Sequence, residues 1–373
     1  PGRPLPPGLR RRKPDTGPIA RIGYHDAHPA SPRTARPPCR PTMSNEPVHG
    51  APPVVLTFAT SDPSGATGMQ ADLLTLASMG CHPLSVVTAI TVQDTTGVES
   101  VLPLEAEWVT DQARCLLEDM PVDAFKIGAL GSVENIAAIA EILADYPDVP
   151  LILDPVLSAG RGDTHATEAM THALRDLLLP QTTIATPNGH ELRLLAEQED
   201  DEDPSAADCA ERLVSAGCEF VLVTGTHEAT REIVNTLYGK GGVVRTDTWA
   251  RLPGPFNGAG GTLASAIAAM LANGLELSDA VREAQDYTWN ALRKAYRPGM
   301  GHFLPDRLFW AREESDARGD DEARLGEVEE VEHIRHAVAH DGQIHAALAR
   351  LILREQLGLH AAADVGVSDG RDE

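Results

Sequence analysis

From residue 54 to residue 295, short apolar runs alternate with longer segments whose apolar residues recur every three or four positions. The short runs predict buried strands, and the longer segments predict helices that bury one face. The predicted strands are Val54–Ala59, Leu84–Val92, Ala124–Ile127, Val149–Leu153, Thr183–Thr186 and Phe220–Val223. The predicted helices are Gly68–Met79, Leu104–Leu117, Val133–Leu143, Ala166–Leu179, Ala206–Ala216, Gly260–Ala272 and Ser278–Ala295. This alternation predicts an α/β fold of three layers, with a mostly parallel central sheet between two layers of helices.

The alternation is interrupted once, by two short apolar runs on either side of a glycine-rich turn. Ile233–Leu237 and Val243–Arg245 are separated by the turn Tyr238-Gly239-Lys240-Gly241-Gly242. A turn of this composition between two strands predicts a hairpin.

The segments that flank the periodic region differ from it in composition. Residues 1–42 carry nine basic residues, two acidic ones and 11 of the 28 prolines, without periodicity. This composition predicts a disordered basic extension. Because Met43 begins a different composition, we interpret the extension as lying upstream of the true start. The predicted organisation is this extension, a linker over 43–53, one domain over 54–311, an acidic linker over 312–332 and a helical tail of unknown role over 333–373.

The tail carries a histidine pair with the i,i+4 spacing of helical metal ligands. His336 and His340 are four residues apart, so one helix face could present both to a metal. Spacing supplies no third ligand. We therefore favour a solvated or self-associating helix over a metal site.

The chain is strongly acidic: its 373 residues hold 31 Lys and Arg against 55 Asp and Glu, a formal net charge of -24. Such a surface repels nucleic-acid phosphates and anionic lipids, so we expect neither as a partner. No apolar run approaches the roughly 18 residues of a membrane span. The five cysteines are scattered without a CxxC pair, which favours a reducing, cytoplasmic location over a disulfide framework or a zinc site.

Candidate chemistry lies where the predicted strands end, since parallel α/β sheets bind ligands beyond the carboxyl ends of their strands. Gly258-Ala259-Gly260-Gly261 precedes an apolar helix, and its backbone N–H groups could converge on an anion. A tight turn packed against the sheet is the alternative interpretation.

Acidic side chains follow three of the predicted strands. Asn188 and Glu191, one helical turn apart, could hold a hydrated Mg²⁺ near phosphates, or could form a helix cap. Asp154 follows the most apolar strand, and Ser61-Asp62 precedes the turn Gly65–Gly68. Taken singly, these last two sites could be ordinary turn residues.

Taken together and in order, these motifs resemble those of the hydroxymethylpyrimidine/phosphomethylpyrimidine kinases of thiamine biosynthesis, within the ribokinase-like superfamily. The resemblance extends over about residues 54–311. It is carried by Ser61-Asp62-Pro63-Ser64-Gly65, Gly68-Met69-Gln70-Ala71-Asp72, Thr88-Ala89 with Gln93, Lys126-Ile127-Gly128, Asp154-Pro155-Val156, Thr186-Pro187-Asn188 with Glu191, and Asn257–Leu263.

The resemblance implies a homodimeric enzyme with a ribokinase-like fold. It would use ATP and Mg²⁺ to phosphorylate 4-amino-5-hydroxymethyl-2-methylpyrimidine and then its monophosphate. By match to the family's motifs, Asp72 would accept a hydrogen bond from the exocyclic amine and Gln93 would pair with the ring edge, while Thr91, Ala129 and Val156 line the ring. Asn188, Glu191 and Thr224 would serve the nucleotide phosphates, Asp154 and Glu191 the metal, and Gly258, Ala259, Gly260 and Gly261 the anion hole.

The sequence departs from the family's pattern at three places. Gly261 stands where the family has Cys or Asp, the presumed base. Thr224 stands where a phosphate-contacting lysine is often found, and Gly65-Ala66-Thr67-Gly68 replaces a turn of two glycines, Ala and Gly. Three functions therefore stay open: an active kinase, a non-catalytic or weakly active pyrimidine-binding homologue, and a pyridoxal kinase-like enzyme.

Overall fold

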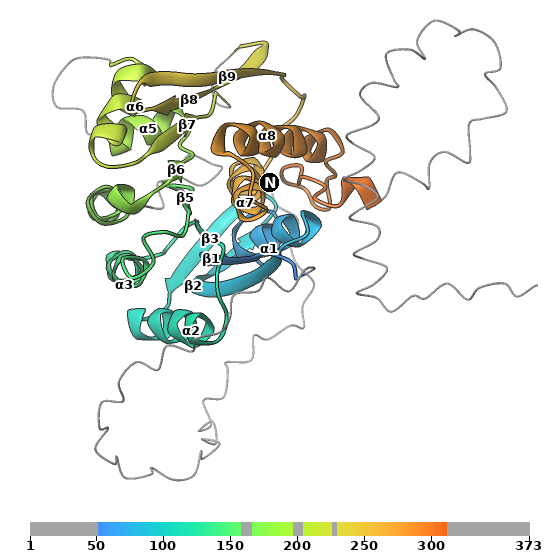
Figure 1. Cartoon of the computed structure of the whole chain (residues 1–373). Coiled ribbons are helices and arrows are strands. Elements are labelled where there is room, and N and C mark those ends of the chain that lie inside the picture. The colour runs from blue at the N-terminus through green and yellow to red at the C-terminus, as the bar shows by residue number, and fades with distance from the viewer. Residues whose placement is uncertain (1–50, 158–165, 197–203, 226–229, 312–373) are drawn as a thin grey trace, which may run out of the picture. The chain divides into compact units, whose positions relative to one another are not determined.

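The computed structural model describes residues 51–157, 166–196, 204–225 and 230–311. Within these residues the chain forms one nine-stranded sheet of order β3-β2-β1-β4-β5-β6-β7-β8-β9 (Figure 1). Strands β2, β1, β4, β5, β6 and β7 run parallel, whereas β3, β8 and β9 pair antiparallel at the two edges. The strands are β1 (Val54–Ser61), β2 (His82–Asp94), β3 (Gly97–Pro103), β4 (Ala124–Ile127), β5 (Leu151–Leu153), β6 (Ile184–Ala185), β7 (Phe220–Val223), β8 (Glu232–Gly239) and β9 (Gly242–Ala250).

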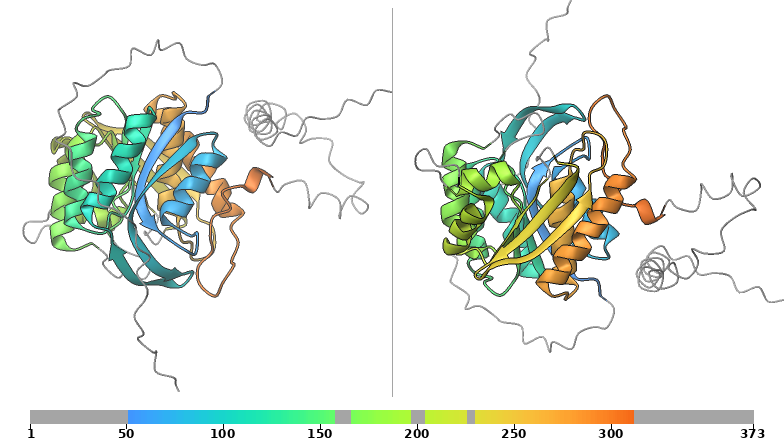
Figure 2. Two further views of the ribbon diagram at one scale, coloured as in Figure 1. Left: turned by 90° about the horizontal axis from the view of Figure 1, so that it is seen from below. Right: turned by 90° about the horizontal axis from the view of Figure 1, so that it is seen from above.

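Helices cover both faces of this sheet (Figure 2). One face packs against α1 (Gly68–Ser78), α7 (Ala259–Ala272) and α8 (Leu277–Arg293). The other packs against α2 (Ala106–Asp119), α3 (Val133–Leu143), α4 (Glu168–Ala173), α5 (Gly189–Leu195) and α6 (Ala206–Ser215). After α4 the chain continues in a π-helical segment, Leu174–Leu178, and a 3-10 turn, Leu179–Gln181; a second 3-10 turn is Phe309–Ala311. The predicted three-layer α/β fold is confirmed.

The inner strand β1 is buried on both faces, as a parallel strand between two helical layers must be. Val55 belongs to the core beneath α1, α7 and α8, whereas Leu56 and Phe58 belong to the core on the opposite face. Helix α7 is buried from Thr262 to Ala269 and built mainly of small residues, so it can pack closely on the sheet despite an aromatic content of only 4%.

Most predicted elements are confirmed, and the two missed elements have identifiable causes. The hairpin is present as β8 and β9, and α3 has the predicted bounds. Strand β3 was missed because most of it is exposed at the sheet edge and carries no buried apolar run. Helix α5 was missed because its seven residues are too few for a periodic pattern.

Several predictions concern segments outside the described residues. These are the basic extension over 1–42, the acidic linker over 312–332 and the tail with His336 and His340. In the part of the chain that the structure describes, no helix is long and apolar enough to cross a membrane.

Candidate active site

The turn after β1 is organised by one buried carboxylate. Asp62 is fully buried. Its Oδ1 accepts hydrogen bonds from the Ser64 amide and hydroxyl, at 2.8 and 2.7 Å. Its Oδ2 accepts from the Thr67 amide and hydroxyl, at 2.7 and 2.9 Å. Asp62 therefore fixes the path of the chain from β1 into α1, a role that its place next to a glycine-bearing turn made plausible.

The end of β2 is tied to this turn by two predicted ring-contacting residues. Gln93 Nε2 donates to Asp62 Oδ2 at 3.0 Å and to Thr67 Oγ1 at 3.2 Å. The Thr91 hydroxyl donates to the Ser61 carbonyl at 2.6 Å. Gln93 is half-buried, so part of its side chain still faces solvent.

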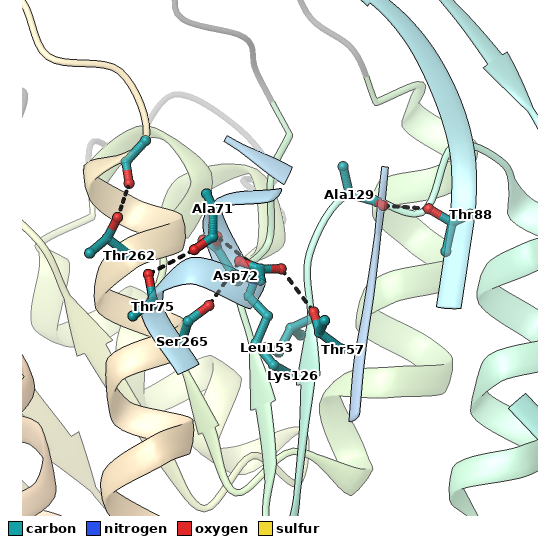
Figure 3. Close-up of polar contacts among 12 residues, drawn as sticks. Thr57, Ala71, Asp72, Thr75, Thr88, Lys126, Ala129, Leu153, Thr262 and Ser265 are labelled. Atoms are coloured by element: carbon teal, nitrogen blue, oxygen red, sulfur yellow. Dashed lines mark hydrogen bonds and ion pairs between the residues drawn. The ribbon is translucent and has the colours of Figure 1, made fainter. Parts of the chain in front are cut away.

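The two other predicted ring-lining residues lie at the ends of neighbouring strands. Ala129 follows β4, and its carbonyl oxygen accepts from the Thr88 hydroxyl at 2.8 Å (Figure 3). Val156 follows β5 by three residues. Both are half-buried. Because β2, β1, β4 and β5 are adjacent and parallel, all four residues lie at the same end of the sheet.

Asp72 lies deeper than the predicted contact with a pyrimidine amine requires. Its carboxylate is fully buried and accepts from Thr57 Oγ1 at 2.8 Å, from Ser265 Oγ at 2.8 Å and from Lys126 Nζ at 2.9 and 3.0 Å (Figure 3). These four bonds occupy the lone pairs of both oxygens. The arrangement therefore gives no support to a direct contact between Asp72 and the substrate; it makes Asp72 the counter-ion of Lys126.

Asp154, the residue after β5, shares the same buried lysine. Its Oδ2 lies 3.8 Å from Lys126 Nζ. Burial raises the pKa of Asp154 to about 6, against an opposing effect of Lys126, and the Asp72 carboxylate adds to the rise. One ammonium group thus faces two carboxylates. It lies closer to Asp72 than to Asp154, so it compensates the charge of Asp154 less.

Asn188 and Glu191 form the helix cap that was one of the two interpretations of their spacing. Asn188 Oδ1 accepts from the Glu191 amide at 3.0 Å, and Glu191 Oε2 accepts from the Asn188 amide at 3.0 Å. This capping box begins α5. Thr224 lies beside it, because its amide donates to the Pro187 carbonyl at 3.0 Å. Burial and the nearby Asp154 carboxylate raise the pKa of Glu191 to about 8, although the amides of Asn188 and Leu157 oppose the rise.

The pKa of Glu191 leads to a prediction about stability and pH. A carboxyl whose pKa rises on folding stabilises the fold below its unfolded pKa, and this contribution is lost as the pH passes its folded value. For Glu191 the two values are 4.5 and about 8. Without divalent cations, we expect thermal stability to fall across this window, and Glu191→Gln, which keeps the cap, to make the fall shallower. If the melting temperatures of the two proteins changed equally with pH, the raised pKa could not be assigned to Glu191.

The glycine turn before α7 has the geometry of an anion-binding helix start. Gly258 is the N-cap residue, with a φ of 90°. Its carbonyl accepts from the Thr262 amide at 3.0 Å, which begins the helix. Cβ atoms built on Gly260 and Gly261 would each lie 3.8 Å from an Asp154 oxygen. The first turn of α7 therefore lies beside Asp154 at the end of β5, and its first N–H groups have no acceptor within the helix.

Arg307 joins this turn to the turn after β1, and it is a functional candidate that the sequence did not predict. Its guanidinium is almost fully buried, and burial lowers its pKa. It donates to Gly65 O at 3.2 Å, to Ala66 O at 2.7 Å and to Thr262 Oγ1 at 3.1 Å. Only its position shortly after the last helix could have drawn attention to it, because no motif marks it.

The chemistry of the acidic groups fits a bound divalent cation. Asp154 and Glu191 both have raised pKa values, and Lys126 is the cation that opposes the rise at Asp154. A hard cation would stabilise both carboxylates, and Mg²⁺ takes only one or two protein carboxylates when phosphates and water complete its shell. In the part of the chain that the structure describes, no group of three or more His, Cys, Asp or Glu side chains could hold a metal ion.

Comparison with known proteins assigns this arrangement to a family. A family model described as phosphomethylpyrimidine kinase matches residues 62–306. The chain belongs to the phosphomethylpyrimidine kinase family. Among curated members, the hydroxymethylpyrimidine/phosphomethylpyrimidine kinase of Streptomyces coelicolor is 36% identical over 254 residues, which are 67% of this chain and 92% of that protein.

Solved structures agree with this family assignment and with the fold. The phosphomethylpyrimidine kinase of Clostridium difficile superposes with a TM-score of 0.56 at 33% identity, covering 64% of this chain and 99% of its own. A pyridoxal kinase from Staphylococcus aureus, solved with pyridoxal, superposes with a TM-score of 0.63 at 28% identity, covering 70% and 96%. The family's fold is therefore shared with kinases that act on a different ring.

Proposed function

We propose that this protein transfers the γ-phosphoryl group of ATP to the hydroxymethyl group of 4-amino-5-hydroxymethyl-2-methylpyrimidine, and then phosphorylates the monophosphate to the diphosphate for thiamine synthesis. One observation of the structure supports the proposal in addition to family membership. Arg307 donates both to the turn that holds Gln93 and to Thr262 of the anion-binding helix. The side expected to hold the ring and the side expected to hold the phosphate are thus joined by one side chain.

The proposed roles follow the positions of the residues. Gln93, Thr91, Ala129 and Val156 form the ring side, and the first N–H groups of α7, from Gly258 to Gly261, receive the charge that develops on the transferred phosphoryl. Asn188 and Thr224 serve the nucleotide phosphates. Asp154 and Glu191 would hold Mg²⁺, which neutralises phosphate charge when bound. Asp72 is given a different role from the predicted one: it keeps Lys126 charged and in place beneath the site.

The direct test is turnover with purified full-length protein. It is incubated with ATP, Mg²⁺ and the hydroxymethylpyrimidine, and the monophosphate and diphosphate are separated by chromatography. Formation of both products in sequence is the expected result. Pyrimidine binding without turnover would favour the non-catalytic homologue, and preferential phosphorylation of pyridoxal in a parallel reaction would favour the pyridoxal kinase.

Gly261 offers a prediction about rate, since no side chain is present there to accept the hydroxyl proton. A Cβ at this position meets nothing closer than 3.8 Å, so the first atom of a side chain fits there. General-base assistance is worth about 10²–10⁴-fold. We expect Gly261→Cys to raise kcat by about tenfold or more, increasingly so at high pH because Asp154 and Asp72 disfavour a thiolate nearby. Gly261→Ala is the matched control. An equal kcat in both variants would contradict the interpretation that Gly261 occupies the position of the missing base.

We also propose that the protein is a homodimer, assembled through the exposed apolar surface of β2 and β3. Ile90 and Leu102 are cross-strand partners, 49% and 64% exposed, and Val92 beside them is 54% exposed. An exposed apolar surface at the edge of a sheet is typical of an interface with another chain. We expect Leu102→Glu to shift the mass measured by light scattering from dimer to monomer. Val243→Glu, on the exposed opposite edge, should leave the dimer intact; a monomeric wild type would contradict the proposal.

The same proposal includes a cytoplasmic location. Cys81 and Cys218 are buried free thiols, which suits a reducing compartment.

A further inference from the structure

The amide of Gln93 is held in one orientation by its neighbours. The atom nearest Asp62 lies 3.0 Å from a carboxylate oxygen. A carboxylate accepts hydrogen bonds and cannot donate them, so this atom must be the amide nitrogen. Its second neighbour, the Thr67 hydroxyl oxygen at 3.2 Å, is an acceptor on the same side. The NH₂ end of Gln93 is therefore turned into the protein, toward the turn after β1.

The carbonyl end of the same amide keeps its capacity to accept. Within the described residues, the donor recorded near Gln93 Oε1 is the Thr91 hydroxyl, at 3.3 Å. That hydroxyl has a single proton, and the Ser61 carbonyl lies closer to it, at 2.6 Å. Because Gln93 is half-buried, its carbonyl oxygen is the polar atom that it can offer to a bound ring.

Thr67 is one of the positions at which this chain departs from the turn of the resembling family. The resembling family has alanine at this place in the turn, which can neither accept from Gln93 nor donate to Asp62. Here the Thr67 hydroxyl does both, because it donates to Asp62 Oδ2 at 2.9 Å while it accepts from Gln93 Nε2. The hydroxyl bridges the two side chains and restrains the rotation of the amide.

We propose that Thr67 is a specificity-determining residue, which holds Gln93 with its carbonyl oxygen toward the substrate and so selects rings that carry a hydrogen-bond donor at that edge. This inference rests on the proposed function. The 4-amino group of the aminopyrimidine is such a donor, whereas a ring with a methyl group in its place has none. Gln93 thereby takes the acceptor role that the resemblance to the family implied for Asp72.

The test compares two ligands on three proteins. The ligands are 4-amino-5-hydroxymethyl-2-methylpyrimidine and its analogue with a methyl group in place of the amine. The proteins are the wild type, Thr67→Val, which removes the hydroxyl at nearly constant shape, and Thr67→Ser, which keeps it. Dissociation constants come from calorimetry without ATP, and kcat and KM from turnover. Circular dichroism shows whether each variant is folded.

We expect the wild type and Thr67→Ser to prefer the amine by about tenfold or more, because a donor is matched to a fixed acceptor. In Thr67→Val this preference should fall severalfold, through weaker binding of the amine, with KM affected more than kcat. An unchanged preference in folded Thr67→Val would overturn the role of Thr67, even if the wild type is an active kinase. Failure of the wild type to bind or phosphorylate the aminopyrimidine would instead reject the proposed function.

Discussion

Replacing Lys126 with methionine should destabilise the protein by about 3–5 kcal/mol, because removing one partner of a buried ion pair leaves the other charge uncompensated. Lys126 is 1% exposed and Asp72 is fully buried, so water cannot replace the lost ammonium. Asp154 would also lose the cation that opposes the rise of its pKa. The loss of this positive charge should therefore also weaken the binding of phosphate groups.

Urea denaturation of Lys126→Met, alone and combined with Asp72→Asn, would measure the effect. The asparagine removes the negative charge; its Oδ1 can accept from one of the two hydroxyls of Thr57 and Ser265, and its Nδ2 can donate to the other. We expect the double variant to be more stable than Lys126→Met alone, since contacting charges are not additive. Asp72→Asn alone is the control for the carboxylate. If Lys126→Met were as stable as the wild type, the buried ion pair between Lys126 and Asp72 would not contribute to the stability of the fold.

The sequence predicted the place of the site better than its internal geometry. Parallel strands put Gln93, Ala129 and Asp154 at one end of the sheet whatever the details of packing, so the strand pattern was sufficient. The hydrogen-bond partners of the Asp72 carboxylate could not be predicted from the strand pattern. They include Lys126 from β4 and Ser265 from α7, which are 54 and 193 residues away in the sequence.

Arg307 shows the same limit more strongly. Its partners in the turn after β1 are more than 240 residues earlier in the chain, and its own segment has no regular periodicity. A buried arginine cannot be recognised from local hydrophobicity, because arginine is usually exposed. By contrast, α3 was predicted with its observed bounds because Ser132 caps a regular apolar repeat, so that local signals agree with the packing.

Gly258→Ala should abolish most of the activity, for two reasons that act together. The residue has a φ of 90°, where a side chain costs roughly 1–3 kcal/mol. A Cβ there would also overlap the Ala66 carbonyl oxygen and lie 2.8 Å from Arg307 Nη2. The methyl group would thus push apart the two turns that Arg307 joins, and a misplacement of about 1 Å can cost about 10²-fold in rate.

Gly260→Ala is the matched comparison, because the same substitution two residues later meets nothing closer than 3.8 Å and needs no left-handed backbone. The stability of Gly260→Ala should stay within about 1 kcal/mol of the wild type, since alanine is favoured over glycine inside a helix. Thermal melts of both variants, with kcat/KM for Gly258→Ala, separate the two cases. If Gly258→Ala melted like Gly260→Ala and kept its activity, close contact between the anion-hole turn and Ala66 could not be a requirement of the site.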